Sequence, residues 1–299
     1  METQSQKHSL IDKCKLKNRW IKEGLAEFLG TFILILFGCG SLAQSILSRG
    51  VYGNMLTVAI GFPFGITIAV YATIGVSGAH LNPAISLSMC VLGRLQWLKL
   101  PVYCFSQLVG AFVGSAAVFG LYYDAFMAFD DGNFAITGQN ATAQIFSSYP
   151  ASHLSFANGF ADQMMGTAAL LFSILAILDS KNNCVPKGLE PVVIGLIIMV
   201  IGLSMGYNCG GPINPARDLG PRLFTAVAGW GLEVFTAGNG WWWVPVIAPL
   251  IGGVLGTAIY VLIIELHHMD TTLKENHCTS EQQAEGKAKY EMITIQCNK

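Results

Sequence analysis

The tripeptide Asn-Pro-Ala occurs twice in this chain, and each copy predicts the start of a helix. The copies are Asn82-Pro83-Ala84 and Asn214-Pro215-Ala216. In both, a preferred N-cap residue stands before a proline, which is favoured at the first helical position. The helix predicted after the first copy, residues 82–92, would be about 16 Å long, roughly half the hydrocarbon core of a bilayer. Two such half-length helices that met end to end would make one span.

Six apolar stretches are long enough to cross a bilayer. Each is close to the length of about 20 residues that a transmembrane helix needs. Together they contain only two formal charges, Glu27 and Asp162, and charged residues make up 12% of the 299-residue chain, about half the share found in soluble proteins. We therefore predict an all-α membrane protein with six transmembrane helices. The stretches are residues 24–46, 55–75, 100–122, 160–178, 191–207 and 242–264.

Basic residues are distributed unevenly over the connections between these stretches. Fourteen of the seventeen Lys and Arg residues lie before the first stretch, between the second and third, between the fourth and fifth, or after the sixth. The positive-inside rule places these connections, and both termini, in the cytoplasm. The connection 123–158 has three aspartates and no Lys or Arg, so it is expected outside, where its acceptor sequence at Asn140 could be glycosylated. The chain is thus predicted to be a multi-pass protein of the plasma membrane.

The chain also contains an internal repeat. The segment around Glu27 matches the segment around Gln163, and a further match relates Gly110 to Gly252. The two members of each pair are separated by nearly the same length of chain as the two Asn-Pro-Ala copies. Because each half contains three spans, an odd number, the second half must be inserted upside down relative to the first. One half-helix is then expected to enter from each side of the membrane.

The backbone before each Asn-Pro-Ala copy is rich in glycine and is expected at membrane depth. Non-helical backbone is tolerated there only if protein covers it or if it lines a water-filled cavity. Two inverted half-helices would bring two partly positive N-termini together at the bilayer centre, which repels cations and protons. Asn82 and Asn214 could cap their helices with the side-chain oxygen and turn the NH2 group toward a passing solute. The sequence therefore predicts a pore for uncharged molecules.

Several segments resemble the aquaporin family. They are Ala-Glu-Phe-Leu-Gly-Thr at 26–31, Ser-Gly-Ala-His-Leu-Asn-Pro at 77–83 and Asn-Pro-Ala-Arg-Asp at 214–218, and the resemblance covers about residues 20–268. Asp218, the long 123–158 connection and the insertion 229–243 resemble the glycerol-conducting branch, the aquaglyceroporins, and vertebrate members most of all. The resemblance implies a passive channel for water, glycerol and small neutral solutes such as urea. It also implies two re-entrant half-helices in an inverted repeat, and a homotetramer in the bilayer.

The predicted organisation is one channel domain between two tails. The N-terminal tail comprises residues 1–19 and the channel domain residues 20–268, whose halves, 20–122 and 159–268, flank the external connection. The C-terminal tail, residues 269–299, is polar and is expected to be disordered.

The resemblance further implies a selectivity filter toward the outside. Its four positions, transferred by their distance from the Asn-Pro-Ala copies, are Phe62, Gly202, Gly211 and Arg217. Arg217 would deter cations and donate to hydroxyl groups, and Phe62 would form an apolar wall. The alternatives are a surface ion pair of Arg217 with Asp218 and a plain core role for Phe62. Bacterial glycerol facilitators have two aromatic residues in this region, so the two glycines predict a wider filter.

Titratable and thiol side chains near the pore leave alternatives open. A carboxylate at membrane depth requires a partner, and the resemblance implies that Glu27 braces the half-helix backbone, with a proton relay as the alternative. Gln163 stands at the matching position without a charge, which puts the symmetry of this brace in question, and Asp162 has no assigned role. His80 either holds its loop or, with Glu27, forms a gate that responds to pH between about 5 and 8. Cys209 is either a reactive thiol near the filter or an inert buried one.

Other classes of protein fit the sequence less well. A secondary transporter is the main alternative because inverted repeats with broken helices also build transporters, and an adhesive or scaffolding protein with a closed pore is a second. No nucleophile, base and orienting residue stand at recognisable spacing, so an enzyme is not expected. The net charge of −1 argues against nucleic acid as a partner, and the eight scattered cysteines include no CxxC pair. No cofactor or metal is predicted.

Overall fold

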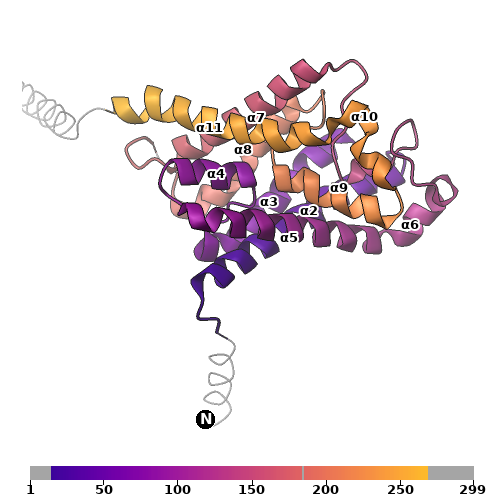
Figure 1. The fold of residues 1–299 in the computed structure, drawn as a ribbon, viewed down its shortest axis with the longest axis horizontal. Helices are drawn as coiled ribbons and strands as arrows, with labels where there is room; N and C mark the ends of the chain where they lie inside the picture. Colours follow the sequence, from indigo (N-terminus) through magenta and orange to yellow (C-terminus); the bar gives the residue numbers. More distant parts are fainter. Residues whose placement is uncertain (1–14, 184, 269–299) are drawn as a thin grey trace, which may run out of the picture. The chain divides into compact units, whose positions relative to one another are not determined.

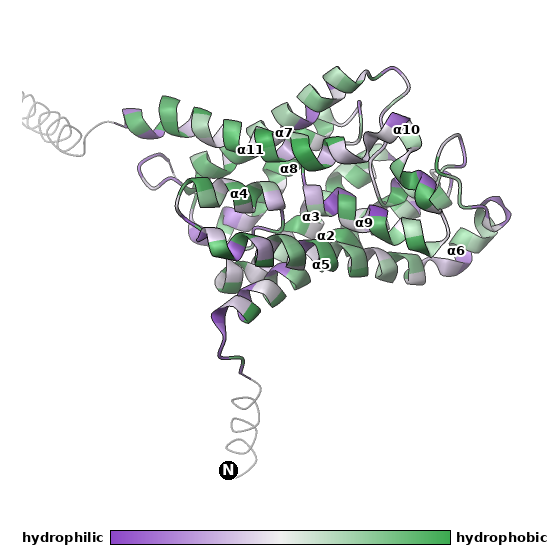
Figure 2. Cartoon of the chain, viewed as in Figure 1, coloured by the Kyte–Doolittle hydropathy of each residue, from purple (hydrophilic) through white to green (hydrophobic). Residues whose placement is uncertain are grey.

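The computed structural model describes residues 15–183 and 185–268. All regular elements within these ranges are helical, and six helical stretches there are long and apolar enough to cross a membrane. Hydrophobic residues dominate these helices, and hydrophilic residues gather at the connections and helix ends (Figure 2). The all-α fold with six spans is therefore confirmed. The disorder predicted for residues 269–299 concerns a segment outside the described residues.

The six long helices follow the predicted apolar stretches and extend some of them by polar turns. Helix α2 begins five residues before its apolar stretch because Asn18 caps it, accepting from the backbone nitrogen of Trp20 at 2.9 Å. Helix α7 begins four residues early, where Ser155 accepts from Asn158 N. The helices are α2 (Arg19–Leu47), α3 (Met55–Ser77), α5 (Leu100–Leu121), α7 (Phe156–Leu178), α8 (Glu190–Met205) and α11 (Val244–Ile263).

Two shorter helices begin where the Asn-Pro-Ala copies predict. Helix α4 (Pro83–Val91) and helix α9 (Pro215–Ala228) have nine and fourteen residues. At 1.5 Å per residue α4 is about 14 Å long and cannot span a bilayer. Figure 1 shows α4 and α9 one after the other along α5, which packs against both. The expected pair of half-length helices is thus present.

Glycines allow the long helices to approach closely at matched positions of the two halves. A Cβ added at Gly110 of α5 would collide with the backbone carbonyl of Phe28 in α2. A Cβ at Gly252 of α11 would collide in the same way with Met164 of α7. The repeat recognised in the sequence therefore corresponds to the same helix contact in both halves.

The two longest connections contain short helices and pack on each other. Phe146 and Trp230 belong to different connections, yet their buried ring centroids are 5.5 Å apart. Trp230 Nε1 also donates to Thr142 Oγ1 at 3.0 Å. This contact holds the connection before α7 against the end of α9. The short elements are α6 (Tyr123–Ala128), η2 (Phe129–Gly132), η3 (Ala143–Ile145), η5 (Leu232–Phe235), α10 (Ala237–Gly240) and η6 (Trp241–Trp243), with η1 (Trp97–Lys99), η4 (Lys187–Leu189) and η7 (Glu265–His267) elsewhere.

Candidate functional site

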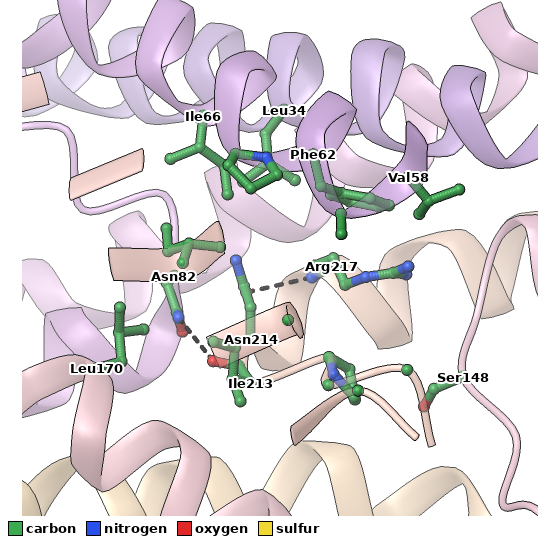
Figure 3. A pocket seen from close by; sticks show the side chains of 18 of the residues that line it. Leu34, Val58, Phe62, Ile66, Asn82, Ser148, Leu170, Ile213, Asn214 and Arg217 are labelled. Atoms are coloured by element: carbon green, nitrogen blue, oxygen red, sulfur yellow. Dashed lines mark hydrogen bonds between the residues drawn. The ribbon is translucent and has the colours of Figure 1, made fainter. Parts of the chain in front are cut away.

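The two asparagines of the Asn-Pro-Ala copies lie next to each other where the half-helices meet (Figure 3). Each caps its own helix: Asn82 Oδ1 accepts from Ala84 N at 2.9 Å, and Asn214 Oδ1 accepts from Ala216 N at 3.0 Å. The predicted N-caps are therefore present.

The amide nitrogens of the same asparagines cross to the opposite loop. Asn82 Nδ2 donates to the Ile213 carbonyl at 2.9 Å, and Asn214 Nδ2 donates to the Leu81 carbonyl at 2.8 Å. The expectation that the whole NH2 group faces the solute is therefore corrected, because one hydrogen of each amide ties the two loops together. An NH2 group has two hydrogens, so one on each asparagine is left for a solute.

Glu27 is fully buried and accepts four hydrogen bonds, two of them from the backbone of the first loop. Its carboxylate accepts from His80 N at 2.9 Å and from Leu81 N at 2.7 Å. It also accepts from Ser77 Oγ at 2.6 Å and Gln107 Nε2 at 2.7 Å. Leu81 has a φ of 55°, a conformation that costs a side-chain-bearing residue about 1–3 kcal/mol unless its surroundings enforce it. The geometry is that of the backbone brace implied for Glu27.

The second loop has a weaker brace of the same kind. Gln163 Oε1 accepts from Ile213 N at 3.1 Å, and Ile213 also has a positive φ, 35°. Gln163 Nε2 donates to Asp162 Oδ2 at 3.0 Å and to Cys209 Sγ at 2.9 Å. Asp162 in turn accepts from Asn208 Nδ2 at 2.7 Å. Asp162, which had no assigned role, thus helps to support the second loop. It lies one residue before Gln163, the position that matches Glu27.

A cavity of about 890 Å³ is lined by both asparagines. Its lining includes Leu178 and Glu190 toward one end of the spans and Thr137 and Gly138 of the long connection toward the other. In Figure 3 the apolar side chains of Leu34, Val58, Phe62 and Ile66 form a row that faces Asn82, Asn214 and Arg217. All four predicted filter positions line this cavity, as do His80 and Cys209, whereas buried Pro83, Ala84, Pro215 and Ala216 form the first helical turns behind the asparagines.

Arg217 and Phe62 contact each other in the predicted filter. The Arg217 Cζ lies 4.7 Å from the centroid of the Phe62 ring, within cation–π distance. Arg217 Nη1 donates to the Phe146 carbonyl at 2.6 Å. The ion pair of Arg217 with Asp218 that the sequence allowed is replaced by one between Asp218 and Arg222, at 2.8 Å.

The two filter glycines leave space in the cavity. A Cβ added at Gly202 of α8 would meet no heavy atom within 4 Å, in contrast to Gly110 and Gly252, which pack tightly. Gly211 has a φ of 58°, and a Cβ there would meet only Gly206 Cα, at 3.9 Å. The geometry therefore agrees with a filter that lacks side chains on this side.

His80 and Asn140 lie in different parts of the structure. His80 Nδ1 is 3.1 Å from Ser86 Oγ, and its ring centroid lies 5.1 Å from that of Tyr103. Asn140, in the connection before α7, donates through Nδ2 to Asp130 at 2.6 Å and accepts from Arg49 at 3.2 Å. His80 is connected to the brace at Glu27 through its backbone nitrogen, and Asn140 is not itself among the residues that line the cavity. Among the described residues, no group of three or more His, Cys, Asp or Glu side chains is placed to hold a metal ion.

Residues 15–260 match the family model described as Major intrinsic protein. The chain belongs to the major intrinsic protein family. It is therefore a member of a family of membrane channels and not an enzyme, as the aquaporin resemblance implies.

Its relatives in this family include human aquaporins. Human aquaporin-9 is 54% identical over 287 residues, which cover 96% of each chain. Human aquaporin-10 is 55% identical over 259 residues, which cover 87% of this chain and 86% of that protein. Among solved structures, an aquaglyceroporin from Plasmodium falciparum is 32% identical with a TM-score of 0.74, covering 82% of this chain and 97% of that one.

Residues that the sequence left unnoticed complete the surroundings of this aquaporin's cavity. The Phe146 carbonyl had no sequence signal because any residue type could supply it. The pair of Asp218 and Arg222 did have one, since opposite charges four residues apart on a helix lie on the same face. The hydrogen bonds from the two asparagine amides to the opposite loops depend on tertiary structure, so no local sequence pattern predicts them.

Proposed function

We propose that the chain is a passive channel for water, glycerol and other small neutral solutes such as urea. The observation that carries the proposal is the cavity in which apolar side chains face Asn82, Asn214 and Arg217. A polyol has a carbon side and a hydroxyl side, so its carbons can follow the apolar row while its hydroxyls bond to the opposite row. Each of these contacts binds the solute only weakly, so the solute can enter the pore and also leave it.

Ions and protons are excluded by positive charge at two levels of the pore. The N-termini of α4 and α9 meet at the asparagines, and each contributes a fraction of a positive charge. Arg217 adds a full positive charge at the filter. Asn82 and Asn214 each use one amide hydrogen on the opposite loop and keep the other for the lumen. A water between them accepts from both remaining hydrogens, so it cannot pass a proton along a continuous chain.

Gly202 and Gly211 set the width of the filter. In the absence of side chains at these two positions, Phe62 and Arg217 bound the passage on one side only. Solutes as large as glycerol then pass together with water.

A substitution at Gly202 tests this assignment directly. Gly202→Phe would place a ring in open space on a helical backbone, whereas Gly211→Phe would also force a side chain onto a φ of 58°. In vesicles, Gly202→Phe is expected to reduce glycerol permeability about tenfold or more and water permeability far less. Gly202→Ala is the control, with a change below about twofold. Equal glycerol permeability in wild type and Gly202→Phe would refute the filter position.

The secondary-transporter alternative is weaker because both acids of the six apolar stretches already have partners. Glu27 accepts four hydrogen bonds, and Asp162 accepts from Asn208, Gln163 and Cys209. A carboxylate occupied in this way has little capacity left for a coupling ion. Uptake that saturates and follows an ion gradient would favour the transporter.

His80, with Glu27, is proposed as a pH-sensitive gate at the inner part of the cavity. Its ring lines the cavity, its Nδ1 contacts Ser86, and its backbone nitrogen donates to Glu27. A charge on the ring would therefore act on both the brace and the lumen. Glycerol flux that responds to pH in wild type but not in His80→Ala would support the gate, and an unchanged response would exclude it.

The charge distribution supports the proposed topology, and the aquaporin resemblance supports the proposed oligomer. We propose a plasma-membrane location, cytoplasmic termini and a homotetramer in which each copy has its own pore.

Asn140, on the external side in this topology, is a proposed glycosylation site. Its Nδ2 hydrogen-bonds to Asp130, and Thr142 of the acceptor sequence is buried, so the sugar must be attached before the loop is fully folded. A glycosidase-sensitive mobility shift that disappears in Asn140→Gln would test both the site and the topology.

A further inference from the structure

The filter arginine is held by a loop segment that is itself held by a buried ion pair. We propose that Asp218 and Arg222 are positioning residues for Arg217 and act through residues 146–149. Neither Asp218 nor Arg222 lines the cavity, and both are fully buried in α9. The inference rests on the proposed role of Arg217 in the filter and assigns a function to two residues that never touch the solute.

The guanidinium of Arg217 has two fixed neighbours. Its Nη1 donates to the Phe146 carbonyl at 2.6 Å, and its Cζ lies 4.7 Å from the centroid of the Phe62 ring. The hydrogen bond is the directional one of the two contacts, so the position of the Phe146 carbonyl decides where the guanidinium lies. Whatever fixes residues 146–149 therefore fixes the filter.

Asp218 binds the backbone of this segment. Ser148 N donates to Asp218 Oδ2 at 2.7 Å, and Ser147 Oγ donates to the Asp218 carbonyl at 3.2 Å. Asp218 directly follows Arg217 in α9. One helix turn thus presents the filter arginine and also anchors the segment that orients it.

Arg222 binds the other side of the same segment. Its Nη2 donates to the Ser148 carbonyl at 2.6 Å and to Asp218 Oδ1 at 2.8 Å, while Nη1 donates to the Val234 carbonyl at 2.9 Å. Its Cζ lies 4.7 Å from the Tyr149 ring centroid. A planar guanidinium can serve three acceptors at once, and a lysine ammonium cannot reproduce that geometry.

Open space around the filter makes this anchoring matter. A Cβ at Gly202 would meet nothing within 4 Å, and one at Gly211 would meet only Gly206 Cα at 3.9 Å, so these two positions place no side chain against Arg217. If the Phe146 carbonyl moves away, the arginine side chain can extend into this space. The passage would then narrow for glycerol more than for water, so Asp218 and Arg222 influence which solutes pass.

The test measures glycerol and water permeability of the full-length chain in proteoliposomes. Asp218→Asn turns an NH2 group toward Arg222 or Ser148 N, and Arg222→Lys removes the planar guanidinium that donates to several acceptors. Each variant is expected to reduce the ratio of glycerol to water permeability about tenfold, which corresponds to the loss of about one charge-assisted hydrogen bond. Ser147→Ala removes the bond to the Asp218 carbonyl at a buried residue that also lines the cavity, and it should give a smaller decrease in the same direction. This milder variant keeps the test decisive if the buried substitutions do not fold.

A second set of variants separates positioning from general stability. In an Arg217→Val background, Asp218→Asn should change the ratio no further, because the residue that it positions is gone. Thr225→Val removes a buried hydrogen bond to the Arg222 carbonyl on the same helix without touching residues 146–149, and its ratio should stay at the wild-type value. An unchanged ratio in Asp218→Asn and Ser147→Ala, or an additive effect with Arg217→Val, would overturn the inference. A wild-type chain that conducts no glycerol would instead overturn the proposed function.

Discussion

Asn82 and Asn214 each cap one half-helix and donate across to the loop that precedes the other. The two amides bond to the carbonyls of Ile213 and Leu81, the residues immediately before the opposite asparagines. This reciprocal exchange joins the two inverted halves at the centre of the cavity. It explains why the same residue type is needed in both copies: an asparagine supplies an acceptor for its own helix and donors for the other loop.

Asn214→Asp should separate the capping role from the crossing role. An aspartate keeps the cap but sets a carboxylate oxygen against the Leu81 carbonyl, so we expect a loss of about 1–3 kcal/mol in stability and a lower Tm. The measurement is thermal unfolding of the purified protein in detergent. Asn54→Asp is the matched control, because the Asn54 side chain accepts only within the first turn of α3, and its Tm should hardly change.

Glu27→Gln should loosen the first loop. A glutamine offers one acceptor oxygen in place of two, so about half of the four donors around it lose their acceptor. We expect a destabilisation of about 3 kcal/mol or more and reduced glycerol flux, because the first loop would lose part of its brace. A variant with wild-type Tm and wild-type flux would show that the carboxylate is not a brace.

Gln163→Glu should destabilise the chain even though it makes the two halves more alike. Gln163 donates to the Asp162 carboxylate, and a glutamate would put a second negative charge beside it. Asp162→Asn, added to this substitution, should restore part of the lost Tm. A rise in Tm on Gln163→Glu alone would contradict the assignment of Asp162 as the carboxylate of the second loop.

Ser86→Ala is expected to shift the pH response that His80 would confer. Ser86 Oγ accepts from Gln107 Nε2 at 3.0 Å and lies 3.1 Å from His80 Nδ1. When Nδ1 of the neutral ring carries no proton, the Ser86 hydroxyl donates to it and stabilises that neutral form. Removing the hydroxyl takes away the partner of the neutral ring and should favour protonation, moving the midpoint of the flux change to higher pH. The check is glycerol flux across pH 5 to 8, with Ser88→Ala as control, because Ser88 bonds only within α4. Equal midpoints in the wild type and Ser86→Ala would exclude this coupling.

The sequence predicted those parts of the fold that depend on local pattern. Apolar length identified the spans, and Asn-Pro identified both half-helix starts. These features follow from hydrophobicity and capping, which act over a few residues. The filter positions Phe62, Gly202, Gly211 and Arg217 were instead implied by the aquaporin resemblance, and they line one cavity.

The contacts that hold the site depend on long-range packing and could not be predicted in the same way. The Phe146 carbonyl reaches Arg217 across 71 positions of sequence, and backbone acceptors have no residue signature. From the sequence, Asp218 is a mark of the glycerol-conducting branch and an alternative ion-pair partner of Arg217. Its ion-pair partner is Arg222, four residues on in the same helix, and its other oxygen accepts from Ser148 N across 70 positions of sequence, which is the long-range contact that local pattern did not predict.

Stopped-flow measurement on proteoliposomes tests the central claim most directly. The osmotic response to glycerol and urea gradients would be recorded for the wild type, with empty vesicles and Gly202→Phe as references. The account predicts solute entry well above that of empty vesicles, proportional to the gradient without saturation and independent of sodium or proton gradients. Entry that saturates and requires an ion gradient, or glycerol entry no faster than in empty vesicles, would contradict it.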